Sequence, residues 1–216
     1  MSVPRSETPY TEAEYLALER GSEERHEYLD GQIYAMAGES LEHGDICMNL
    51  SRIVSTDLLG TSCRALSKDT KVRSGPIPKL RYSTKGLYSF PDLVVVCGEP
   101  HFLDEHRDVL LNPKLIIEVL SPTTEAFDRG EKFLRYRTYL DSLTDYVVVA
   151  QSMPLVEHFE LQNGQWVIAA TATELSETVV LSSIGCTLRL SEVYDRIVFP
   201  EETPELPSTG KRTTLY

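Results

Sequence analysis

The chain has 216 residues, 41% of them hydrophobic, and a formal net charge of −12. A chain of this length can bury one substantial core, so we expect a single domain over residues 10–199 with flexible termini at 1–9 and 200–216. No apolar run approaches the roughly 20 residues that cross a bilayer, and no leader-like pattern opens the chain, so we expect a cytoplasmic protein without a membrane segment.

The first predicted elements are a helix, a hairpin and a second helix. A capping-box pattern at Thr11 predicts a helix that ends near Gly21. An Asp-Gly pair at Asp30 predicts a tight turn between two short strands. Apolar residues at helical spacing predict the second helix over residues 40–59.

Strands dominate the rest of the chain, with one long helix predicted over residues 121–140 and a short one near 191–196. Ser121 and Thr124 are expected to cap the long helix. The predicted strands are 63–66, 70–73, 92–97, 114–120, 146–150, 156–161, 166–170, 179–181 and 187–190. This order predicts a mixed α/β (α+β) fold, with a central mixed β-sheet flanked by helices and extra strands near the C-terminal end.

Four cysteines, Cys47, Cys63, Cys97 and Cys186, are scattered along the chain and form no close pair. Their spacing fits neither a zinc motif nor a disulfide framework. We therefore expect buried, reduced thiols, which are usual in a cytoplasmic protein.

Two of the predicted strands each carry one carboxylate in an apolar, β-branched run. Asp92 opens the run 92–97, and Glu118 lies inside the run 114–120. A buried charge is costly unless it is paired or bound to a metal, so these strands indicate carboxylates gathered at one site. Oxygen ligands of this kind suit Mg²⁺ or Mn²⁺ and metal-assisted attack on a phosphodiester.

The segment from Arg64 to Lys85 is basic, although the chain as a whole is acidic. It holds seven basic residues and one acid, Asp69, so its net charge is +6 while the rest of the chain carries −18. The overall charge argues against a general nucleic-acid binder. The basic segment offers candidates for phosphate contact, or else forms an ordinary solvated surface. The candidates for DNA binding are Arg64, Lys68, Lys71 and Arg73.

The predicted helix over residues 121–140 places Asp128, Lys132 and Tyr136 on one face, because they are spaced four residues apart. A lysine beside metal-bound carboxylates can hold a phosphate or position the attacking water. The alternative is a surface ion pair between Asp128 and Lys132, which would contribute only about a few tenths of a kcal/mol.

Three short motifs follow one another along the chain: Pro91-Asp92, Glu118–Thr124 and Asp128–Lys132. In this order they resemble the Uma-type putative restriction endonucleases, a family of the PD-(D/E)XK nuclease superfamily, and the resemblance covers nearly the whole predicted domain. It implies a restriction-endonuclease-like core, with a mixed sheet between helices. It also implies a divalent metal, Mg²⁺ or Mn²⁺, between Asp92 and Glu118.

One position departs from the superfamily pattern. That pattern has a lysine two residues after the glutamate, where this chain has Leu120. A nuclease without this lysine needs the cation from elsewhere, and Lys132 on the following helix is the candidate. The catalytic set suggested by the resemblance is therefore Asp92, Glu118 and Lys132, with Asp92 and Glu118 as metal ligands.

Glu42 and His43 lie near the start of the second predicted helix, where this superfamily often contributes an acidic residue to the metal site. Alternatively, Glu42 only interacts favourably with the dipole of the helix, and His43 only caps the helix. Together with Asp128 and Tyr136, they are the candidates for supporting the site.

The residues and the resemblance together predict a metal-dependent endonuclease that hydrolyses DNA phosphodiester bonds. One alternative is a catalytically degenerate member that binds nucleic acid or a protein, which Leu120 and the net charge of −12 favour. Another is a hydrolase of a different phosphate ester, because a fold does not fix its substrate. A homodimer would suit cleavage of both strands of a duplex.

Overall fold

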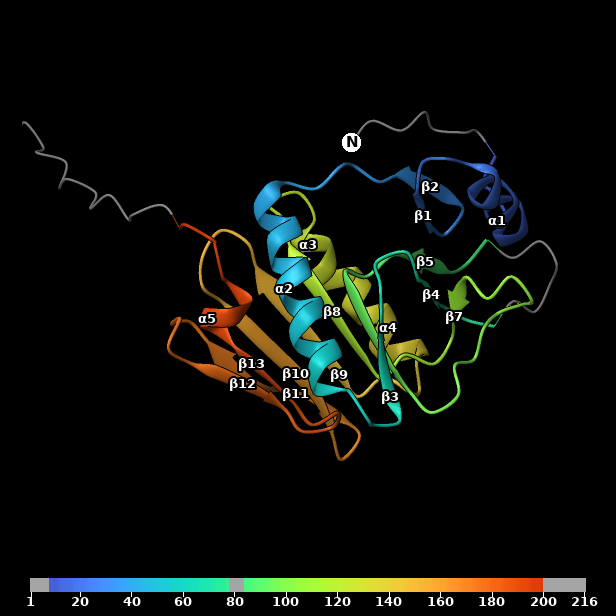
Figure 1. The fold of residues 1–216 in the computed structure, drawn as a ribbon. Helices are drawn as coiled ribbons and strands as arrows, with labels where there is room; N and C mark the ends of the chain where they lie inside the picture. The colour runs from blue at the N-terminus through green and yellow to red at the C-terminus, as the bar shows by residue number, and fades with distance from the viewer. Residues whose placement is uncertain (1–7, 78–83, 200–216) are drawn as a thin grey trace, which may run out of the picture.

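Within the residues that the structure describes, the strands form two mixed sheets and a separate hairpin (Figure 1). The computed structural model describes residues 8–77 and 84–199, so the predictions for the two termini lie almost wholly outside the described residues. The helices are α1 (Glu12–Gly21), α2 (Leu41–Asp57), α3 (Glu125–Phe127), η1 (Asp128–Lys132, a π-helix), α4 (Phe133–Tyr139) and α5 (Leu190–Val193). None of these helices combines the length and the apolar character that a membrane crossing requires. The strands are β1 (His26–Leu29), β2 (Gln32–Ala35), β3 (Cys63–Leu66), β4 (Lys71–Ser74), β5 (Leu87–Ser89), β6 (Leu93–Cys97), β7 (Val109–Leu110), β8 (Leu115–Leu120), β9 (Asp145–Ala150), β10 (Val156–Gln162), β11 (Gln165–Ala172), β12 (Thr178–Leu181) and β13 (Cys186–Arg189).

The six-stranded sheet has the order β11-β10-β9-β8-β6-β3. Its β8–β9 pair is parallel, with Glu118 opposite Val148, and its other pairs are antiparallel. The five-stranded sheet has the order β2-β1-β5-β4-β7, and its β4–β7 pair is parallel. The mixed α+β fold class predicted from the sequence is confirmed, with the strands divided between two sheets instead of one central sheet.

Side chains alternate along β6 and β8, so these strands send apolar groups to both faces of the six-stranded sheet. One face packs against α2 through Ile46, Leu50 and Val54. The opposite face packs against α4 through Phe133 and Tyr136, and the two helices lie on opposite sides of the sheet (Figure 1). Burial on both faces explains why the sequence of these strands is almost continuously apolar.

The helix α1 is attached to the five-stranded sheet by aromatic packing and a buried ion pair. The rings of Tyr15, Tyr28 and Tyr88 lie with centroids 5.2 to 5.9 Å apart. Glu12 accepts two hydrogen bonds from the Arg73 guanidinium of β4, each 2.9 Å long. The positive charge of Arg73 is therefore neutralised by Glu12 in the interior of the protein.

Thr11 begins α1 with the capping box that the sequence predicts. Its hydroxyl accepts a hydrogen bond from the N–H of Glu14, and the Glu14 carboxylate accepts one from the N–H of Thr11. We expect Thr11→Ala to lower the free energy of unfolding by about 1 kcal/mol, because one helical N–H loses its partner. Thr11→Ser keeps the oxygen and is the control. Urea unfolding measures the difference, and an unchanged midpoint for Thr11→Ala would contradict the expectation.

Two short strands and one helix break go beyond the sequence predictions. The strands β5 and β7 have three and two residues, which is too short for a periodic pattern.

The predicted helix over residues 121–140 is divided into α3, η1 and α4. Thr124 stands at the start of α3 without a side-chain capping bond, and the Ser121 hydroxyl lies 2.9 Å from the Thr124 hydroxyl instead. The predicted capping by these two side chains is therefore wrong.

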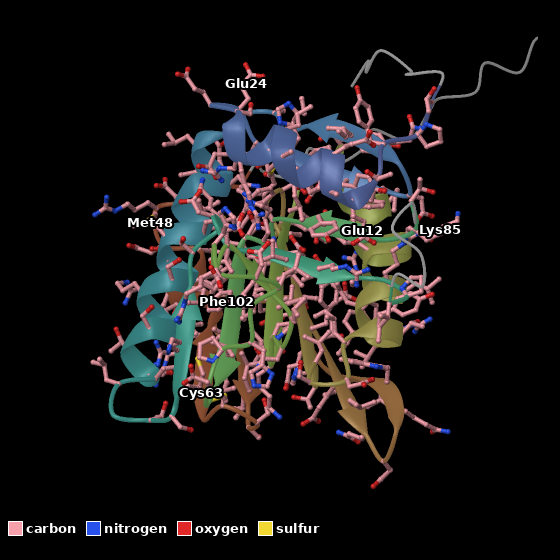
Figure 2. All side chains as sticks on the ribbon, turned by 90° about the vertical axis from the view of Figure 1, so that its right-hand side faces the viewer. Glu12, Glu24, Met48, Cys63, Lys85 and Phe102 are labelled. Carbon is pink, nitrogen blue, oxygen red and sulfur yellow. A yellow bond between two sulfur atoms is a disulfide. The ribbon has the colours of Figure 1, made fainter. Side chains whose placement is uncertain are left out.

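Cys63 and Cys97 form a disulfide, so the expectation of four reduced thiols is wrong. The two residues lie opposite each other in the antiparallel pair of β3 and β6, and Figure 2 shows the sulfur–sulfur bond near the label of Cys63. They are 34 residues apart in the chain, and only the pairing of the strands brings them together. Cys47 and Cys186 are free and buried, as expected.

Candidate active site

Asp92 and Glu118 come from neighbouring strands, where β6 begins and β8 approaches its end. Asp92 directly precedes β6, and the register pairs Leu93 with Ile117, which brings Asp92 beside Glu118. Oδ2 of Asp92 accepts a hydrogen bond from the backbone N–H of Val119 at 2.7 Å. The strand register therefore fixes the relative positions of the two carboxylates.

The ammonium group of Lys132 lies 3.0 Å from Oε1 of Glu118 and 3.2 Å from Oδ1 of Asp128. Glu118 is only 3% exposed and Lys132 only 5%, so Asp128 and Lys132 do not form a surface pair. Leu120 lies on the same face of β8 as Glu118, because residues i and i+2 of a strand share a face. The cation thus approaches Glu118 from the helical segment that packs on this face, and not from the strand.

The π-helix η1 turns two charged side chains inward. Asp128 and Lys132 are its first and last residues and both are buried, whereas Glu131 is exposed. A π-helix has a wider turn than an α-helix, and single turns of this kind occur frequently at functional sites. Here the wide turn precedes α4 and places Lys132 against Glu118.

Tyr136, one turn after Lys132, donates a hydrogen bond to Oε1 of Glu118 at 3.3 Å. Its hydroxyl also lies 2.7 Å from the hydroxyl of Ser89 in β5. Burial raises the pKa of Tyr136 well above its ordinary value. The phenol therefore remains protonated and fixes one oxygen of Glu118.

Glu27 of β1 is a residue of the cluster that the sequence analysis missed. Its Oε1 lies 3.6 Å from Nζ of Lys132 and accepts a hydrogen bond from the N–H of Phe90 at 3.0 Å. The one available signal was an acidic residue inside a predicted strand, where Glu is depleted. Ser89 was missed as well, since β5 itself was not predicted.

The buried cluster contains more carboxylates than cations. Burial raises the pKa of Glu118 well above its usual range; the charge of Lys132 opposes this shift, and the neighbouring carboxylates add to it. Burial alone would lower the pKa of Lys132, but the charges of Glu118 and Glu27 outweigh it and raise the pKa. The lysine therefore stays charged, and a further cation beside Glu118 would lower the pKa of this carboxyl.

His43 contacts Asp92, whereas Glu42 is turned to solvent. Nε2 of His43 lies 2.9 Å from Oδ1 of Asp92. Burial disfavours the charged form of both groups, but their hydrogen bond and mutual attraction outweigh it, so the pKa of His43 is raised and that of Asp92 is lowered. Glu42 is exposed in the first turn of α2, where hydrogen bonds with its own backbone N–H and with Ser40 lower its pKa.

A pocket of about 480 Å³ opens onto Asp92 beside the N-terminal end of α2. Its other walls come from Glu39, from the first turns of α2, and from the loop between β3 and β4 that carries Lys68. Glu118 and Lys132 do not line this pocket. Solvent therefore approaches the cluster from the side of Asp92.

The four predicted DNA-binding residues have different surroundings. Lys71 and Arg73 are buried in ion pairs with carboxylates of the protein, so neither presents its charge to a ligand in this structure. Lys68 lines the pocket beside Asp92 and pairs with Glu39 there, but its side chain is still 38% exposed, and Arg64 is exposed on β3. Lys68 and Arg64 therefore remain the candidates for contact with phosphate.

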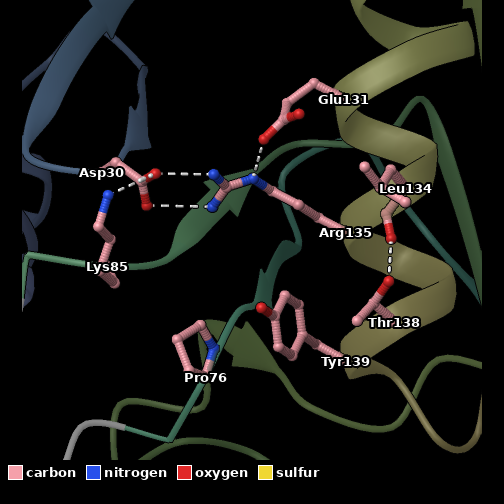
Figure 3. Close-up of a pocket in the computed structure, with 8 residues that line it drawn as sticks. All are labelled: Asp30, Pro76, Lys85, Glu131, Leu134, Arg135, Thr138 and Tyr139. Carbon is pink, nitrogen blue, oxygen red and sulfur yellow. Dashed lines mark hydrogen bonds and ion pairs between the residues drawn. The ribbon is translucent and has the colours of Figure 1, made fainter.

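A second pocket, of about 570 Å³, lies between α4 and the β1–β2 turn (Figure 3). Its guanidinium, Arg135, donates hydrogen bonds to both oxygens of Asp30 at 3.1 and 2.8 Å and a third to Glu131 at 2.7 Å. Lys85 lies 3.4 Å from the same aspartate. None of the site residues predicted from the sequence lines this pocket, so we place the candidate active site at Asp92 and not here.

Relatives of the chain are found by sequence and by structure. The uncharacterized protein slr1290 of Synechocystis sp. is 34% identical over 187 residues, which cover 86% of this chain and 92% of that protein. The uncharacterized protein sll1609 of the same organism is 32% identical over 168 residues, which cover 77% of this chain and 90% of that one.

Among solved structures, the chain is similar to a putative nuclease belonging to DUF820 from Anabaena variabilis. The TM-score is 0.69 at 17% sequence identity, and the match covers 88% of this chain and 100% of that one. This likeness shows the fold, which is restriction-endonuclease-like. The model of the family Uma2, described as "Putative restriction endonuclease", matches residues 12–191. The chain therefore belongs to the Uma2 family of putative restriction endonucleases.

Proposed function

We propose that this protein is a metal-dependent endonuclease that hydrolyses DNA phosphodiester bonds, with Asp92, Glu118 and Lys132 as its catalytic residues. The observation that carries the proposal is the buried contact of Lys132 with Glu118 at 3.0 Å, beside Asp92. A lysine in this position offers the cation that Leu120 does not. Membership of the family supports nuclease chemistry, and the donor atoms of the cluster support a metal.

The residues present fit a hard divalent cation. Asp92 and Glu118 would hold Mg²⁺ or Mn²⁺ through carboxylate oxygens, the ligands these ions prefer. In the described part of the chain no third carboxylate, histidine or cysteine joins these two in a compact ligand set. Such a sparse set suits Mg²⁺, which keeps several water ligands. The excess of carboxylates in the cluster also favours a cation.

Each neighbouring side chain has a distinct task in this mechanism. A bound ion supplies polarisation of a phosphoryl oxygen and a more acidic water. Lys132 stabilises the negative charge that develops on the phosphate. His43 orients Asp92, and Tyr136 orients Glu118.

DNA would approach through the pocket beside α2, because Asp92 lines it. Lys68 on the pocket wall and Arg64 on β3 would supply charge for contacts with the phosphate backbone. We further propose that residues 10–199 act as one domain, and that two copies act as a homodimer on a duplex, since a two-fold axis presents one site to each strand.

Cleavage assays on plasmid and oligonucleotide DNA with Mg²⁺ or Mn²⁺ test the proposal. We expect the wild type to cut and Asp92→Ala and Glu118→Gln to lose activity by at least about 100-fold, because each removes a metal ligand. Glu42→Gln is the matched control, since this carboxylate is exposed and belongs to the same part of the fold. Activity that survives in both site variants would exclude the proposed site.

The burial of the cluster favours a second candidate function, that of a degenerate member which binds nucleic acid without cutting it. Glu118 and Lys132 are almost wholly removed from solvent, and the buried pair then serves stability. A wild type that binds DNA in a salt-dependent manner, but cuts it with neither Mg²⁺ nor Mn²⁺, would support this candidate over the nuclease.

A further inference from the structure

We propose a second metal site, of the zinc type, formed by Glu39, His43 and Cys47 at the pocket beside α2. One carboxylate oxygen, one imidazole nitrogen and the thiol sulfur of these residues all lie within 4.8 Å of one another. The nuclease cluster has no use for a thiol at this place. The inference does not depend on the proposed nuclease activity, since it concerns other ligands and another class of metal.

The local sequence builds this ligand set. His43 and Cys47 are four residues apart on α2, so they project from the same face of the helix. Glu39 directly precedes Ser40, whose hydroxyl caps α2 by accepting a hydrogen bond from the N–H of His43. The cap therefore holds Glu39 close to the first turn, next to the other two ligands.

The chemistry of the three donors selects the metal. Thiolate and imidazole are ligands for Zn²⁺ and its transition-metal neighbours, whereas Mg²⁺ and Ca²⁺ prefer oxygen. Three protein ligands leave a fourth position of a tetrahedral ion for water or a substrate, as in catalytic zinc sites. Glu39 and Cys47 both line the pocket, so this fourth position would face it.

The surroundings favour a cation. Asp92 holds the His43 ring at 2.9 Å, and a carboxylate partner of this kind fixes the ring orientation of metal-bound histidines. The pocket wall carries Glu39, Asp45, Asp69 and Asp92 against one lysine, Lys68. Lys68 forms an ion pair with Glu39. A bound metal would therefore replace one cation beside Glu39, the Lys68 ammonium group, with another, and no apolar contact would have to be broken.

Cobalt titration of the full chain tests the site. The protein is stripped of metal with a chelator, freed of the chelator, and titrated with Co²⁺, which takes zinc sites and reports its ligands by absorption. We expect one equivalent of Co²⁺ to produce a thiolate-to-cobalt charge-transfer band that Zn²⁺ abolishes. Cys47→Ser should lose this band and weaken Co²⁺ binding by at least about tenfold.

Cys186→Ser is the matched control, because Cys186 is the other free, buried cysteine and lies on β13; this variant should keep the band. Glu39→Gln replaces an exposed ligand with little risk to folding, and should weaken Co²⁺ binding by about tenfold while the band remains. If Cys47→Ser fails to fold, Glu39→Gln decides, and unchanged affinity in that variant would overturn the proposal.

The outcomes separate this site from the nuclease site. Absence of the band in the wild type, or its persistence in Cys47→Ser, would overturn the zinc-type site. If such a wild type still cuts DNA with Mg²⁺, the proposed function stands without it. Glu118→Gln should abolish cleavage and leave the cobalt band intact, since Glu118 lies outside the three-ligand set.

Discussion

Lys132→Met is expected to lower the rate of metal-dependent DNA cleavage by about 100- to 1,000-fold, the usual effect of removing one charge-stabilising donor from an active site. The ammonium group is 3.0 Å from Glu118, close to where negative charge would develop on a phosphate. Methionine keeps much of the length and volume of the lysine, so the packing around this buried side chain is least disturbed. Single-turnover cleavage of a labelled duplex at saturating Mg²⁺ measures the rate.

Two further variants make the result interpretable. Lys132→Arg should not restore the rate, because a planar guanidinium does not match the compact ammonium in a buried site. Lys114→Met, at the opposite end of β8, should cut like the wild type. Circular dichroism establishes that each variant is folded. A fully active, folded Lys132→Met protein would remove this residue from the catalytic set.

Asp145→Ala is expected to lower the free energy of unfolding at pH 7 by about 3 kcal/mol, because a buried carboxylate that accepts several hydrogen bonds is removed. Asp145 is fully buried, and its oxygens contact His158 at 2.8 Å and the hydroxyls of Thr144 and Ser183 at 2.5 Å each. Removing the carboxylate leaves these three groups without their partner. Urea unfolding gives the difference, with the exposed Asp141→Ala as the matched control.

The same residue predicts a pH dependence of stability. Burial would raise the pKa of Asp145, but its hydrogen bonds from His158, Ser183 and Thr144 outweigh burial and lower the pKa. A carboxyl whose folded-state pKa is depressed stabilises the fold above its unfolded pKa of about 3.9, and this contribution is lost as the pH falls through the folded pKa. The stability gap between wild type and Asp145→Ala should therefore narrow below about pH 4. A gap that widens there would contradict this account.

Elements with strong local signals could be predicted from the sequence. The capping box at Thr11 starts α1, and the Asp-Gly pair forms the β1–β2 turn with positive φ at Asp30 and Gly31. Strands β6 and β8 were evident from their apolar runs. The name of the fold came from the resemblance of three motifs, since periodicity alone indicates only a mixed α/β protein.

Features that depend on pairing across the chain could not be predicted. The disulfide between Cys63 and Cys97 needs the register of β3 with β6. The strand β5 is only three residues long, and its place between β1 and β4 is set by tertiary packing. The π-helix η1 has no sequence signature, because one wide turn changes the helical spacing by a single residue.

In the candidate site too, residues with a local sequence signal could be predicted, whereas residues brought in by pairing across the chain could not. Asp92 and Glu118 were found because a carboxylate in an apolar strand is unusual, and Lys132 because it shares a helical face with Asp128. Glu27 and Ser89 were missed because they belong to the other sheet. No local pattern connects that sheet to Glu118.

The buried cluster around Lys132 also connects the two sheets of the protein. Glu27 lies in the five-stranded sheet, Glu118 in the six-stranded sheet, and Lys132 contacts both. Lys132 therefore links two sheets whose strands alternate along the chain. A substitution of Lys132 removes a shared cation from both sheets at once, so it is expected to weaken the packing of β1 on the six-stranded sheet as well as the candidate site. One side chain thus serves both the candidate site and the join between the two sheets.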